Sequence, residues 1–333
     1  MIEKLTSNVL ITGGAGFIGS HIVHYHLEKG NQVWVIDNLD TGNMENIRPF
    51  LSHPSFRFDQ ADIRSFPRLQ EAVVWSNRIF HIAATLNMEK AITNPIYTLS
   101  NNFHCCEKVL EAMDKAKRDI RFIITSSSVV YWHSTPAADK TFHEDAMLVL
   151  PSGAFLQESY GLSKITNEVM TLAYGFQKGL HCVIARIFNT VGIRQSAAYG
   201  AVIPRFISQA LNGEPITVYG NGLQTRSFCN VKDIVKALDL LIENPNTKGE
   251  IFNVCYDKEY TILEIAEMIR KKTNSKSEIS YISYKEAFGI DFTDATERRP
   301  NIEKLIRYTG FQPQVSLEKT IDEILSEKNK KKD

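Results

Sequence analysis

The residues with the clearest chemical potential are a tyrosine and a lysine four positions apart, Tyr160 and Lys164. They open a helical pattern over residues 160–176, and this spacing places both side chains on one face of a helix. A tyrosine of ordinary pKa, about 10, is a poor base at neutral pH, and a neighbouring ammonium would lower that pKa. Because such pairs are common in amphipathic helices, a second group is needed. A serine run, Ser126–Ser128, follows a predicted strand over 121–125, and a hydroxyl there could hydrogen-bond the oxygen that the tyrosine deprotonates.

A glycine-rich turn near the start of the chain separates an apolar run from a helical pattern. The run Val9–Ile11 breaks into Gly13, Gly16 and Gly19, and the amphipathic pattern that follows ends at Gly30. A strand, a glycine turn and a helix in this order are the context of a dinucleotide-binding fingerprint. The helix N-terminus would offer its unpaired N–H groups to the phosphates.

A carboxylate completes this fingerprint about twenty residues further on. Residues 32–36 read as a second strand that ends at Asp37. A carboxylate there can accept hydrogen bonds from both ribose hydroxyls of an adenosine and would repel a 2′-phosphate. The sequence therefore favours NAD over NADP as the cofactor.

Strand-like runs alternate with helical patterns through the first 190 residues. This alternation predicts an α/β protein, a doubly wound parallel-sheet Rossmann fold with helices on both faces. Glycines and prolines are more frequent after that point and the elements become shorter, which predicts a smaller C-terminal lobe. We predict an NAD-binding domain over 1–189 and about 229–256, a substrate-binding lobe over about 190–228 and 257–325, and a charged tail over 326–333.

The composition narrows the class of protein. The 333 residues are 43% hydrophobic and 23% charged, as in an ordinary soluble enzyme, and the formal net charge is zero. We therefore expect no nucleic-acid partner. No apolar run approaches the ~18 residues of a membrane span, and no secretory leader precedes the first strand, so we expect a cytoplasmic protein without membrane contact. The five cysteines form no Cys-x-x-Cys pair, and we expect buried reduced thiols and no metal site.

Together these motifs resemble the extended short-chain dehydrogenase/reductases, and in particular their nucleotide-sugar epimerase/dehydratase branch, which includes UDP-glucose 4-epimerase and UDP-glucuronate decarboxylase. The resemblance covers nearly the whole chain with its motifs in order. It is carried by residues 12–20, 35–39, 81–84, 125–131, 160–164, 186–195, 218–228, 298–301 and 308–313.

The resemblance implies a reaction through a transient keto-sugar. In that branch a bound NAD⁺ takes a hydride from a sugar carbon while a tyrosine takes the hydroxyl proton. The implied catalytic residues are Ser127, Tyr160 and Lys164. The implied NAD contacts are Gly13, Gly16, Phe17, Ile18, Gly19, Asp37, Asn38, Asp62, Ile63, Ala83, Ala84, Asn102, Tyr160 and Lys164, with Asp62 and Ile63 capping the adenine and Asn102 ordering the loop near the catalytic serine.

The resemblance also implies contacts to a nucleotide-sugar substrate, which we expect to be UDP-linked. The matching positions are Ser127, Asn189, Arg226 and Arg298. Arginine suits a diphosphate because its planar guanidinium donates two parallel hydrogen bonds.

One departure from the family's pattern bears on the reaction. Decarboxylases and 4,6-dehydratases carry a glutamate two residues before Tyr131, and this chain has Val129 there. Valine cannot move a proton, so those reactions would need another carboxylate, for which Glu144, Asp145 and Glu158 are the candidates. We therefore predict a 4-epimerase, with a UDP-glucuronate decarboxylase or 4,6-dehydratase as the alternative.

Further departures keep a third reading open, a non-catalytic NAD-binding protein of the same fold. Trp132 and Ile193, like Val129, replace residues typical of the family. Leu86 stands where some glucose epimerases carry lysine, which favours a substrate other than UDP-glucose. The loop between Ser127 and Tyr160 contains Trp132, Phe142 and Phe155, and it could line a sugar pocket or form a surface flap.

Two helical patterns suggest a homodimer. Related enzymes pair helices like those at about 98–117 and 156–177 across a two-fold axis as a four-helix bundle. The apolar residues behind this expectation are Val109, Leu110, Met113, Val169, Met170, Leu172 and Tyr174. The alternative is that these faces simply cover the sheet.

Overall fold

A seven-stranded sheet, with every neighbouring pair parallel, forms the centre of the molecule in the order β11-β6-β5-β4-β1-β2-β3. The computed structural model describes residues 6–85, 93–150, 158–197, 201–288 and 298–330. The strands are β1 (Asn8–Thr12), β2 (Gln32–Asp37), β3 (Phe56–Gln60), β4 (Arg78–His81), β5 (Arg121–Ser127), β6 (His181–Ile187) and β11 (Ile251–Val254). The predicted doubly wound α/β fold is confirmed.

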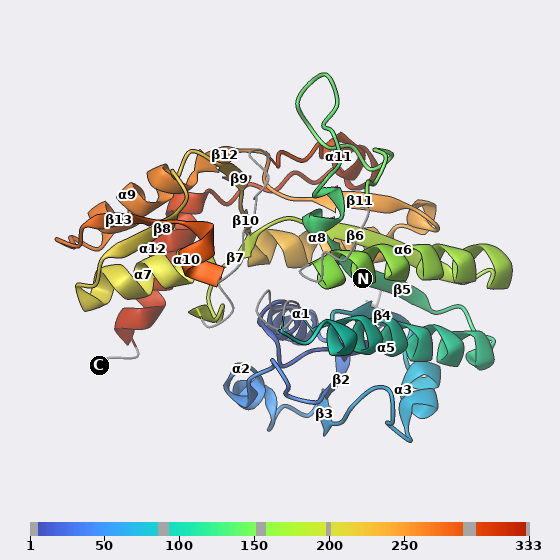
Figure 1. Cartoon of the computed structure of the whole chain (residues 1–333). Coiled ribbons are helices and arrows are strands. Elements are labelled where there is room, and N and C mark those ends of the chain that lie inside the picture. The colour runs from blue at the N-terminus through green and yellow to red at the C-terminus, as the bar shows by residue number, and fades with distance from the viewer. Residues whose placement is uncertain (1–5, 86–92, 151–157, 198–200, 289–297, 331–333) are drawn as a thin grey trace.

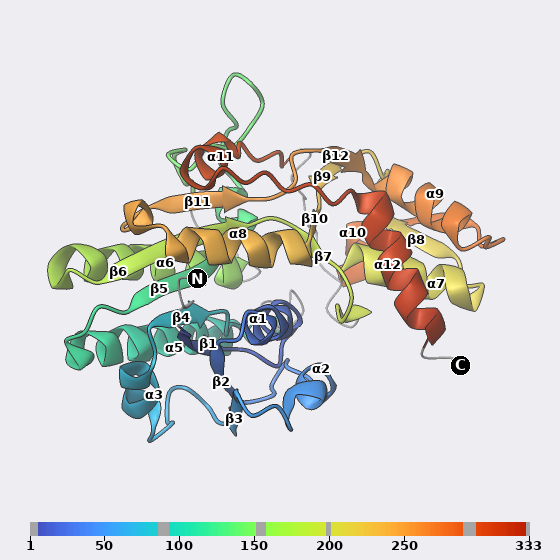
Figure 2. The ribbon, with the colours of Figure 1, turned by 180° about the vertical axis from the view of Figure 1, so that it is seen from behind.

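Helices cover both faces of this sheet (Figures 1 and 2). Alternate residues of β1 show why: Val9 and Ile11 belong to the apolar cluster under one set of helices, and Leu10 belongs to the cluster under the other. The first set is α1 (Phe17–Glu28), α8 (Val231–Glu243) and α11 (Glu303–Thr309). The second set is α3 (Leu69–Trp75), α5 (Pro95–Ala116) and α6 (Ser159–Lys178).

The face of α5 that sequence reasoning offered for a dimer is used inside the chain. Val109, Leu110 and Met113 are at most 1% exposed and belong to the apolar cluster between the helices and the sheet. On α6, Met170, Leu172 and Tyr174 also pack against this cluster, whereas Val169 is 62% exposed. For Val109, Leu110 and Met113, covering the sheet is the correct interpretation, and for the partly buried residues of α6 a dimer contact stays a prediction.

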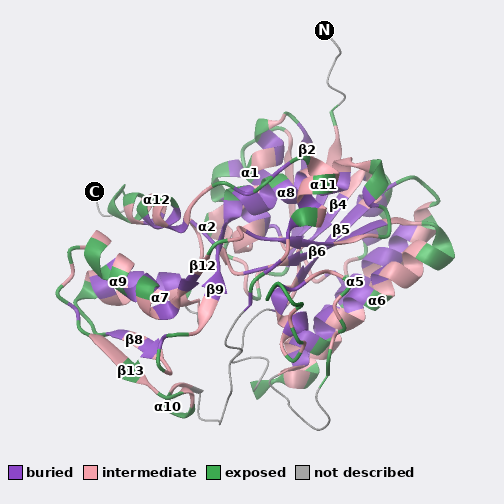
Figure 3. Ribbon diagram, turned by 90° about the horizontal axis from the view of Figure 1, so that it is seen from above, coloured by how far each residue is buried: buried purple, intermediate pink, exposed green. Residues whose placement is uncertain are grey.

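Short strand pairs and further helices form a lobe beside the main sheet, on the left in Figure 1. The strand pairs are β7 (Thr190–Val191) with β10 (Cys229–Asn230), β8 (Ile216–Tyr219) with β13 (Ile279–Ile282), and β9 (Thr225–Ser227) with β12 (Glu259–Thr261). The helices are α7 (Val202–Asn212), α9 (Ile262–Lys272), α10 (Tyr284–Phe288) and α12 (Leu317–Lys330). Phe206, Ile265 and Ile321 bring α7, α9 and α12 into one apolar cluster. The purple interiors of both lobes in Figure 3 are these clusters. The exact domain boundaries stay predictions.

Short helical turns complete the described chain. They are α2 (Met44–Ile47), η1 (Arg48–Phe50), η2 (Ser128–Tyr131) and η5 (Pro245–Thr247). Within the described residues no helix combines the length and apolarity needed to cross a membrane. All five cysteines are buried.

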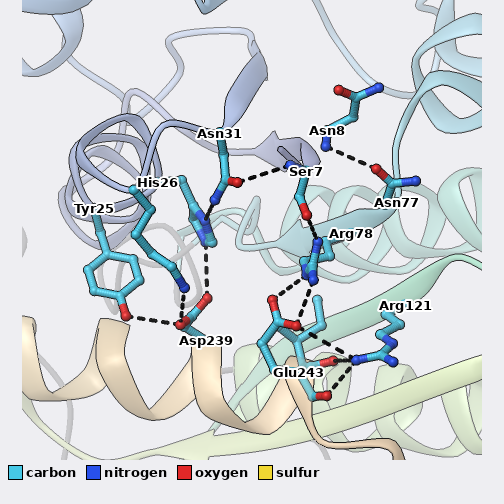
Figure 4. A network of polar contacts seen from close by, with 12 residues as sticks. Ser7, Asn8, Tyr25, His26, Asn31, Asn77, Arg78, Arg121, Asp239 and Glu243 are labelled. Atoms are coloured by element: carbon cyan, nitrogen blue, oxygen red, sulfur yellow. Dashed lines mark hydrogen bonds and ion pairs between the residues drawn. The ribbon is translucent and has the colours of Figure 1, made fainter. Parts of the chain in front are cut away.

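A network of charged side chains lies at the amino-terminal ends of the strands, between α1 and α8 (Figure 4). Asp239 of α8 is 4% exposed and accepts hydrogen bonds from Tyr25 (2.9 Å) and Lys29 (2.8 Å) of the α1 region. One turn further along α8, Glu243 pairs with Arg78 of β4 and with Arg121 of β5. Each buried carboxylate in this network has a cationic partner, and the network ties α8 across the start of the sheet.

Candidate active site

The carboxyl ends of the strands open into one cavity of about 790 Å³. Such an edge is where open parallel sheets bind ligands, because the chain reverses its strand order there. The cavity walls contain most of the site residues that sequence reasoning proposed. These are Gly13, Gly16, Phe17, Ile18, Gly19, Asp37, Asn38, Asp62, Ile63, Ala83, Ala84, Ser127, Tyr160, Lys164, Asn189, Arg226 and Arg298.

The glycine turn after β1 is shaped for close approach to a phosphate. Gly13 has φ +75°, and a Cβ there would lie 2.7 Å from the Ala83 backbone nitrogen. Gly16 caps α1, and a Cβ on it would lie 3.2 Å from the Gly13 carbonyl oxygen. The first N–H groups of a helix have no carbonyl partner within the helix, so they are available to an anion. The turn therefore fits the diphosphate of a dinucleotide.

Two aspartates line the adenosine end of the cavity. Asp37 accepts hydrogen bonds from the backbone N–H groups of Ala15 (2.9 Å) and Leu39 (2.8 Å), which fix its carboxylate beside the glycine turn. Burial raises the pKa of Asp37. Asp62 accepts from the guanidinium and the backbone of Arg64, and this hydrogen bonding lowers its pKa. Asp37 keeps lone pairs that suit ribose hydroxyls, whereas each oxygen of Asp62 already accepts two contacts from Arg64.

The proposed catalytic residues converge from two elements. Ser127 ends β5, where its hydroxyl accepts from the Val129 N–H at 3.3 Å, while Tyr160 and Lys164 lie in the first turns of α6. The Lys164 ammonium is 5.7 Å from the centre of the Tyr160 ring and donates to the Thr125 carbonyl at 2.8 Å. The predicted grouping of these three residues is thus what the fold builds.

The expected direction of the Tyr160 pKa is wrong for the protein alone. Burial raises the pKa of Tyr160, and the hydrogen bond with Ser127 opposes this only in part. Burial also lowers the pKa of Lys164, to about 8, although Cys106 and Glu168 act in the other direction. Desolvation disfavours both charged forms and is the largest cause of both shifts. When bound, NAD⁺ supplies the hydride acceptor and a positive charge beside the phenol.

A buried network holds the catalytic helix against the sheet. Glu168, one turn beyond Lys164, receives hydrogen bonds from Arg186 at 2.7–3.2 Å, and both side chains are at most 4% exposed. Arg186 also donates to the Tyr131 hydroxyl at 2.7 Å, and that hydroxyl donates to Asn253 of β11 at 2.8 Å. Tyr131 therefore acts through packing and polar contacts behind the cavity, since it is 1% exposed.

Asn102 is placed differently from the prediction that it contacts the cofactor. It is 1% exposed and is absent from the cavity wall. Its amide accepts from the Thr85 N–H at 2.7 Å and donates to Ser163 on α6 at 2.9 Å. Asn102 thus ties the segment after β4 to the catalytic helix and positions both.

The proposed substrate residues lie on the side of the cavity formed by the smaller lobe. The Asn189 amide donates to the Ser227 carbonyl at 2.8 Å, which holds it beside Arg226 of β9. Arg226 and Arg298 are only 6% and 8% exposed, and the Arg298 guanidinium is 4.8 Å from the centre of the Trp132 ring. Cations at such depth create a favourable environment for an anionic ligand.

Comparison with known proteins gives the family. The family model "NAD dependent epimerase/dehydratase family" matches residues 9–255. The chain belongs to this family. It is 33% identical to a UDP-N-acetyl-alpha-D-glucosaminuronate decarboxylase of Bacillus cytotoxicus over 95% of this chain and 96% of the relative. It is 36% identical to UDP-glucuronic acid decarboxylase 3 of Arabidopsis thaliana, over 93% of this chain and 85% of the relative.

Solved structures of the family share the whole fold. A UDP-glucuronic acid 4-epimerase from Bacillus cereus, in complex with UDP-glucuronic acid and NAD, superimposes with a TM-score of 0.86 at 25% identity, over 97% of this chain and 99% of that one. This chain is accordingly a nucleotide-sugar-modifying enzyme that uses NAD.

The three carboxylates considered as replacements for the family's glutamate face away from the cavity. Glu144 accepts from the Asn253 N–H at 2.8 Å, and Glu158 contacts His133 at 2.6 Å. Asp145 lines a separate surface hollow. The carboxylates that do line the cavity within the described residues are Asp37, Asp40 and Asp62, at the end of β2 or in the loops that follow β2 and β3, at its dinucleotide end.

The loop after Ser127 lines the cavity in one part and packs into the core in another. Trp132 lines the cavity, next to Val129. Phe142 instead is 3% exposed and stacks on Tyr131 in the core, with ring centroids 5.0 Å apart. Phe155 and Leu86 lie outside the described residues.

Sequence reasoning missed several cavity residues of the smaller lobe. The Arg205 guanidinium lies 3.8 Å from the centre of the Tyr219 ring and donates to the Thr217 carbonyl at 3.0 Å, and burial lowers its pKa to about 10. Gln224 donates to the Tyr219 carbonyl and to the Tyr284 hydroxyl. Arg194 is described below. Arg194, Tyr219 and Gln224 lie in stretches that carry the family resemblance, but the motifs assign these residues no role. Arg205 and Tyr284 lie outside those stretches, and arginines and tyrosines in amphipathic elements are usually surface residues.

Metal ligands form no cluster in the part of the chain that the structure describes, where no group of at least three His, Cys, Asp or Glu side chains could hold an ion.

Proposed function

We propose that this enzyme is an NAD-dependent 4-epimerase of a UDP-linked sugar. Tyr160 accepts the proton of the C4 hydroxyl, Ser127 hydrogen-bonds the same oxygen, and a hydride leaves C4 for NAD⁺. The transient ketone then turns over and takes the hydride back on its other face. One observation carries this choice. Val129 occupies the wall position of the family's glutamate, and no described carboxylate lines the cavity outside its dinucleotide end.

Elimination of water, the 4,6-dehydratase reaction, is the outcome that this wall supports least. It requires an acid and a base beside the sugar in addition to the tyrosine. Epimerisation needs only Tyr160, the cofactor and space for the ring to turn.

Decarboxylation of a UDP-uronic acid is the second candidate, and the relatives named above favour it over epimerisation. Oxidation at C4 would turn the sugar into a β-keto acid. The ketone can take up the electrons of the breaking bond between C5 and the carboxyl carbon, so the release of CO₂ requires no base. Tyr160 could protonate the resulting enolate. A wall without carboxylates would also avoid repelling a uronate.

Support for UDP comes from the smaller lobe and from the relatives. Tyr219 and Tyr284 lie in the cavity wall with ring centroids 6.2 Å apart, and Gln224 and Arg205 add amide and guanidinium donors beside them. Aromatic faces with convergent donors suit a nucleobase with carbonyl acceptors.

Product analysis with UDP-glucuronate separates the candidates, because all the relatives named above act on or bind uronate nucleotides. Inversion of the C4 carbinol, followed by NMR, would support the epimerase. Release of CO₂ with a UDP-pentose would support the decarboxylase. UDP-glucose and UDP-N-acetylglucosamine should be tested in parallel. NAD retention without turnover on any of them would favour the non-catalytic reading, which the intact set of Ser127, Tyr160 and Lys164 argues against.

We also infer a homodimer that uses α6, through residues other than most of those named from the sequence. Leu162, Val169 and Phe176 are 40%, 62% and 91% exposed and recur every seven residues, so they form one apolar stripe. Val169→Glu with Phe176→Glu should shift the mass measured by light scattering from dimer to monomer. A monomeric wild-type protein at micromolar concentration would contradict the inference.

A further inference from the structure

Arg194 reaches from the segment after β7 to the dinucleotide-binding helix. Its Nη1 donates to the Ser20 carbonyl in the first turns of α1 at 3.1 Å, and its guanidinium lies 5.8 Å from the centre of the Phe50 ring. The preceding carbonyl, of Ile193, contacts His21 Nε2 on the same helix at 2.9 Å. Arg194 also lines the cavity that contains Gly16 and the first residues of α1.

The backbone of Arg194 is strained. Its φ is +71°, in the left-handed region that costs a residue with a Cβ roughly 1 kcal/mol relative to glycine. Lys117, Lys140 and Asn274 also have positive φ, but these residues are exposed in turns or at helix ends. Arg194 is instead half-buried beside a cavity. Leu39 is the other positive-φ residue with a side chain among the described residues, and it lies next to Asp37 at the dinucleotide end of the cavity. Strain of this kind persists where a ligand contact depends on it.

Arg194 forms no ion pair with a carboxylate in the part of the chain that the structure describes, so its guanidinium keeps donors for an anionic ligand. Its hydrogen-bond partner among the described residues is a neutral carbonyl, and burial lowers its pKa, with Glu327 of α12 acting in the other direction. Within the described residues the cavity wall contains five cations, Lys164, Arg194, Arg205, Arg226 and Arg298. Lys164 lies beside Tyr160. Arg205, Arg226 and Arg298 lie on the side of the smaller lobe.

Arg194 is thus the cavity cation that contacts α1, at the end where Asp37, Asp40 and Asp62 are acidic. The glycine turn offers a diphosphate only neutral N–H groups. We propose that Arg194 binds the diphosphate of NAD, so that the segment after β7 retains the cofactor together with the glycine turn. A guanidinium matches phosphate oxygens by donating paired hydrogen bonds.

Arg194→Gly tests this proposal by separating folding from binding. Glycine relieves the backbone strain, so the unfolding temperature of the NAD-free protein should stay the same or rise. The dissociation constant for NAD, measured by calorimetry, should increase about tenfold or more, as for loss of a hydrogen bond to a charged group. The ratio of the two dissociation constants, variant over wild type, should become smaller as salt is added, because the lost contact is ionic. Arg194→Lys keeps the charge without the paired donors, so its dissociation constant for NAD should lie between those of the wild type and of Arg194→Gly.

A second ligand locates the contact. ADP-ribose has the diphosphate of NAD without the nicotinamide, so it should lose the same factor of affinity. Lys117→Gly relieves a similar left-handed strain at the exposed end of α5 and should leave both affinities unchanged. Wild-type NAD affinity in Arg194→Gly would overturn the proposal. So would a loss confined to NAD and absent with ADP-ribose, because it would move the contact to the nicotinamide half. These readouts do not depend on which reaction the enzyme catalyses.

Discussion

The charged side chains between α1 and α8 and the cations of the cavity wall have partners of different kinds. At the amino ends of the strands, Asp239 pairs with Lys29, and Glu243 pairs with Arg78 and Arg121. At the carboxyl ends, Arg186 pairs with Glu168 behind the cavity, but three cations of the cavity wall are each held by a neutral carbonyl. Lys164 donates to Thr125, Arg194 to Ser20 and Arg205 to Thr217.

This difference separates a structural network from a binding site. A buried charge with an ionic partner contributes little net stability, but removing the partner leaves the other charge buried and costs several kcal/mol. A buried cation without an anion is costly before the ligand arrives, and a ligand's phosphates then supply the missing partner. The protein is therefore organised to hold α1 and α8 together at one end and to receive anions at the other.

The largest expected effect is catalytic and lies at the carboxyl end. Tyr160→Phe removes the proton acceptor, so kcat should fall by about 10²–10⁴ while NAD stays bound. Steady-state rates with the substrate found by product analysis, together with NAD content, provide the measurement. Tyr281→Phe is the matched control, because Tyr281 is 54% exposed on β13. Full activity in Tyr160→Phe would remove this residue from the mechanism.

A change at the amino end should affect stability and leave the chemistry intact. Asp239→Ala leaves Lys29 without its anion and the Tyr25 hydroxyl without its acceptor, so the free energy of unfolding should fall by about 2–3 kcal/mol. Urea denaturation would measure this. Asp322 pairs with Lys272 at 2.6 Å but is 61% exposed, so Asp322→Ala should cost at most ~1 kcal/mol. Equal losses of unfolding free energy in the two variants would show that the buried ion pair matters no more than the exposed one.

Removing a cation at the carboxyl end should weaken ligand binding and leave the stability of the fold almost unchanged. Arg205→Met keeps an apolar side chain on Tyr219 and removes a buried charge that has no described ionic partner. We expect the free energy of unfolding to change by less than ~1 kcal/mol and the dissociation constant for UDP to rise about tenfold. Calorimetry with UDP measures the affinity. A large loss of stability with unchanged UDP binding would place Arg205 among the structural charges.

The smallest expected effect is a pH dependence that belongs to Lys164. Its pKa in the folded protein is about 8, below the ordinary value of 10.5. Above pH 8 the unfolded chain therefore binds more protons at this lysine than the folded chain, so its contribution to stability rises with pH. From pH 7 to 9 the wild type should gain about 1 kcal/mol relative to Lys164→Met. Comparing the two proteins cancels the titration of the buried cysteines. A constant difference would contradict the lowered pKa.

The sequence predicted those parts of the site that depend on local spacing. The glycine turn, Asp37 and the group of Ser127, Tyr160 and Lys164 follow from the ends of strands and from one helical turn, and the structure brings them to one cavity. Arg194 and Arg205 were missed because their roles depend on tertiary contacts, with Ser20 and Tyr219 respectively.

The predictions that differ from the structure concern residues whose role depends on how deeply they are buried. The Tyr160 pKa depends on desolvation, which spacing does not reveal. Asn102 was assigned to the cofactor, but it lies behind the wall and holds Thr85 and Ser163. Val109 on α5 was assigned to an interface, but it packs in the core of its own chain. In each case the chemistry of the residue was known from the sequence, but its burial and its neighbours were not.

The central claim is that Tyr160 takes a hydroxyl proton while a hydride moves to NAD⁺. The most direct test is rapid mixing of the NAD-loaded enzyme with UDP-glucuronate, observing the near-ultraviolet absorbance of reduced nicotinamide. We predict a transient rise that slows when the sugar carries deuterium at C4 and that disappears in Tyr160→Phe. Turnover of the sugar without any such signal and without an isotope effect would contradict the account.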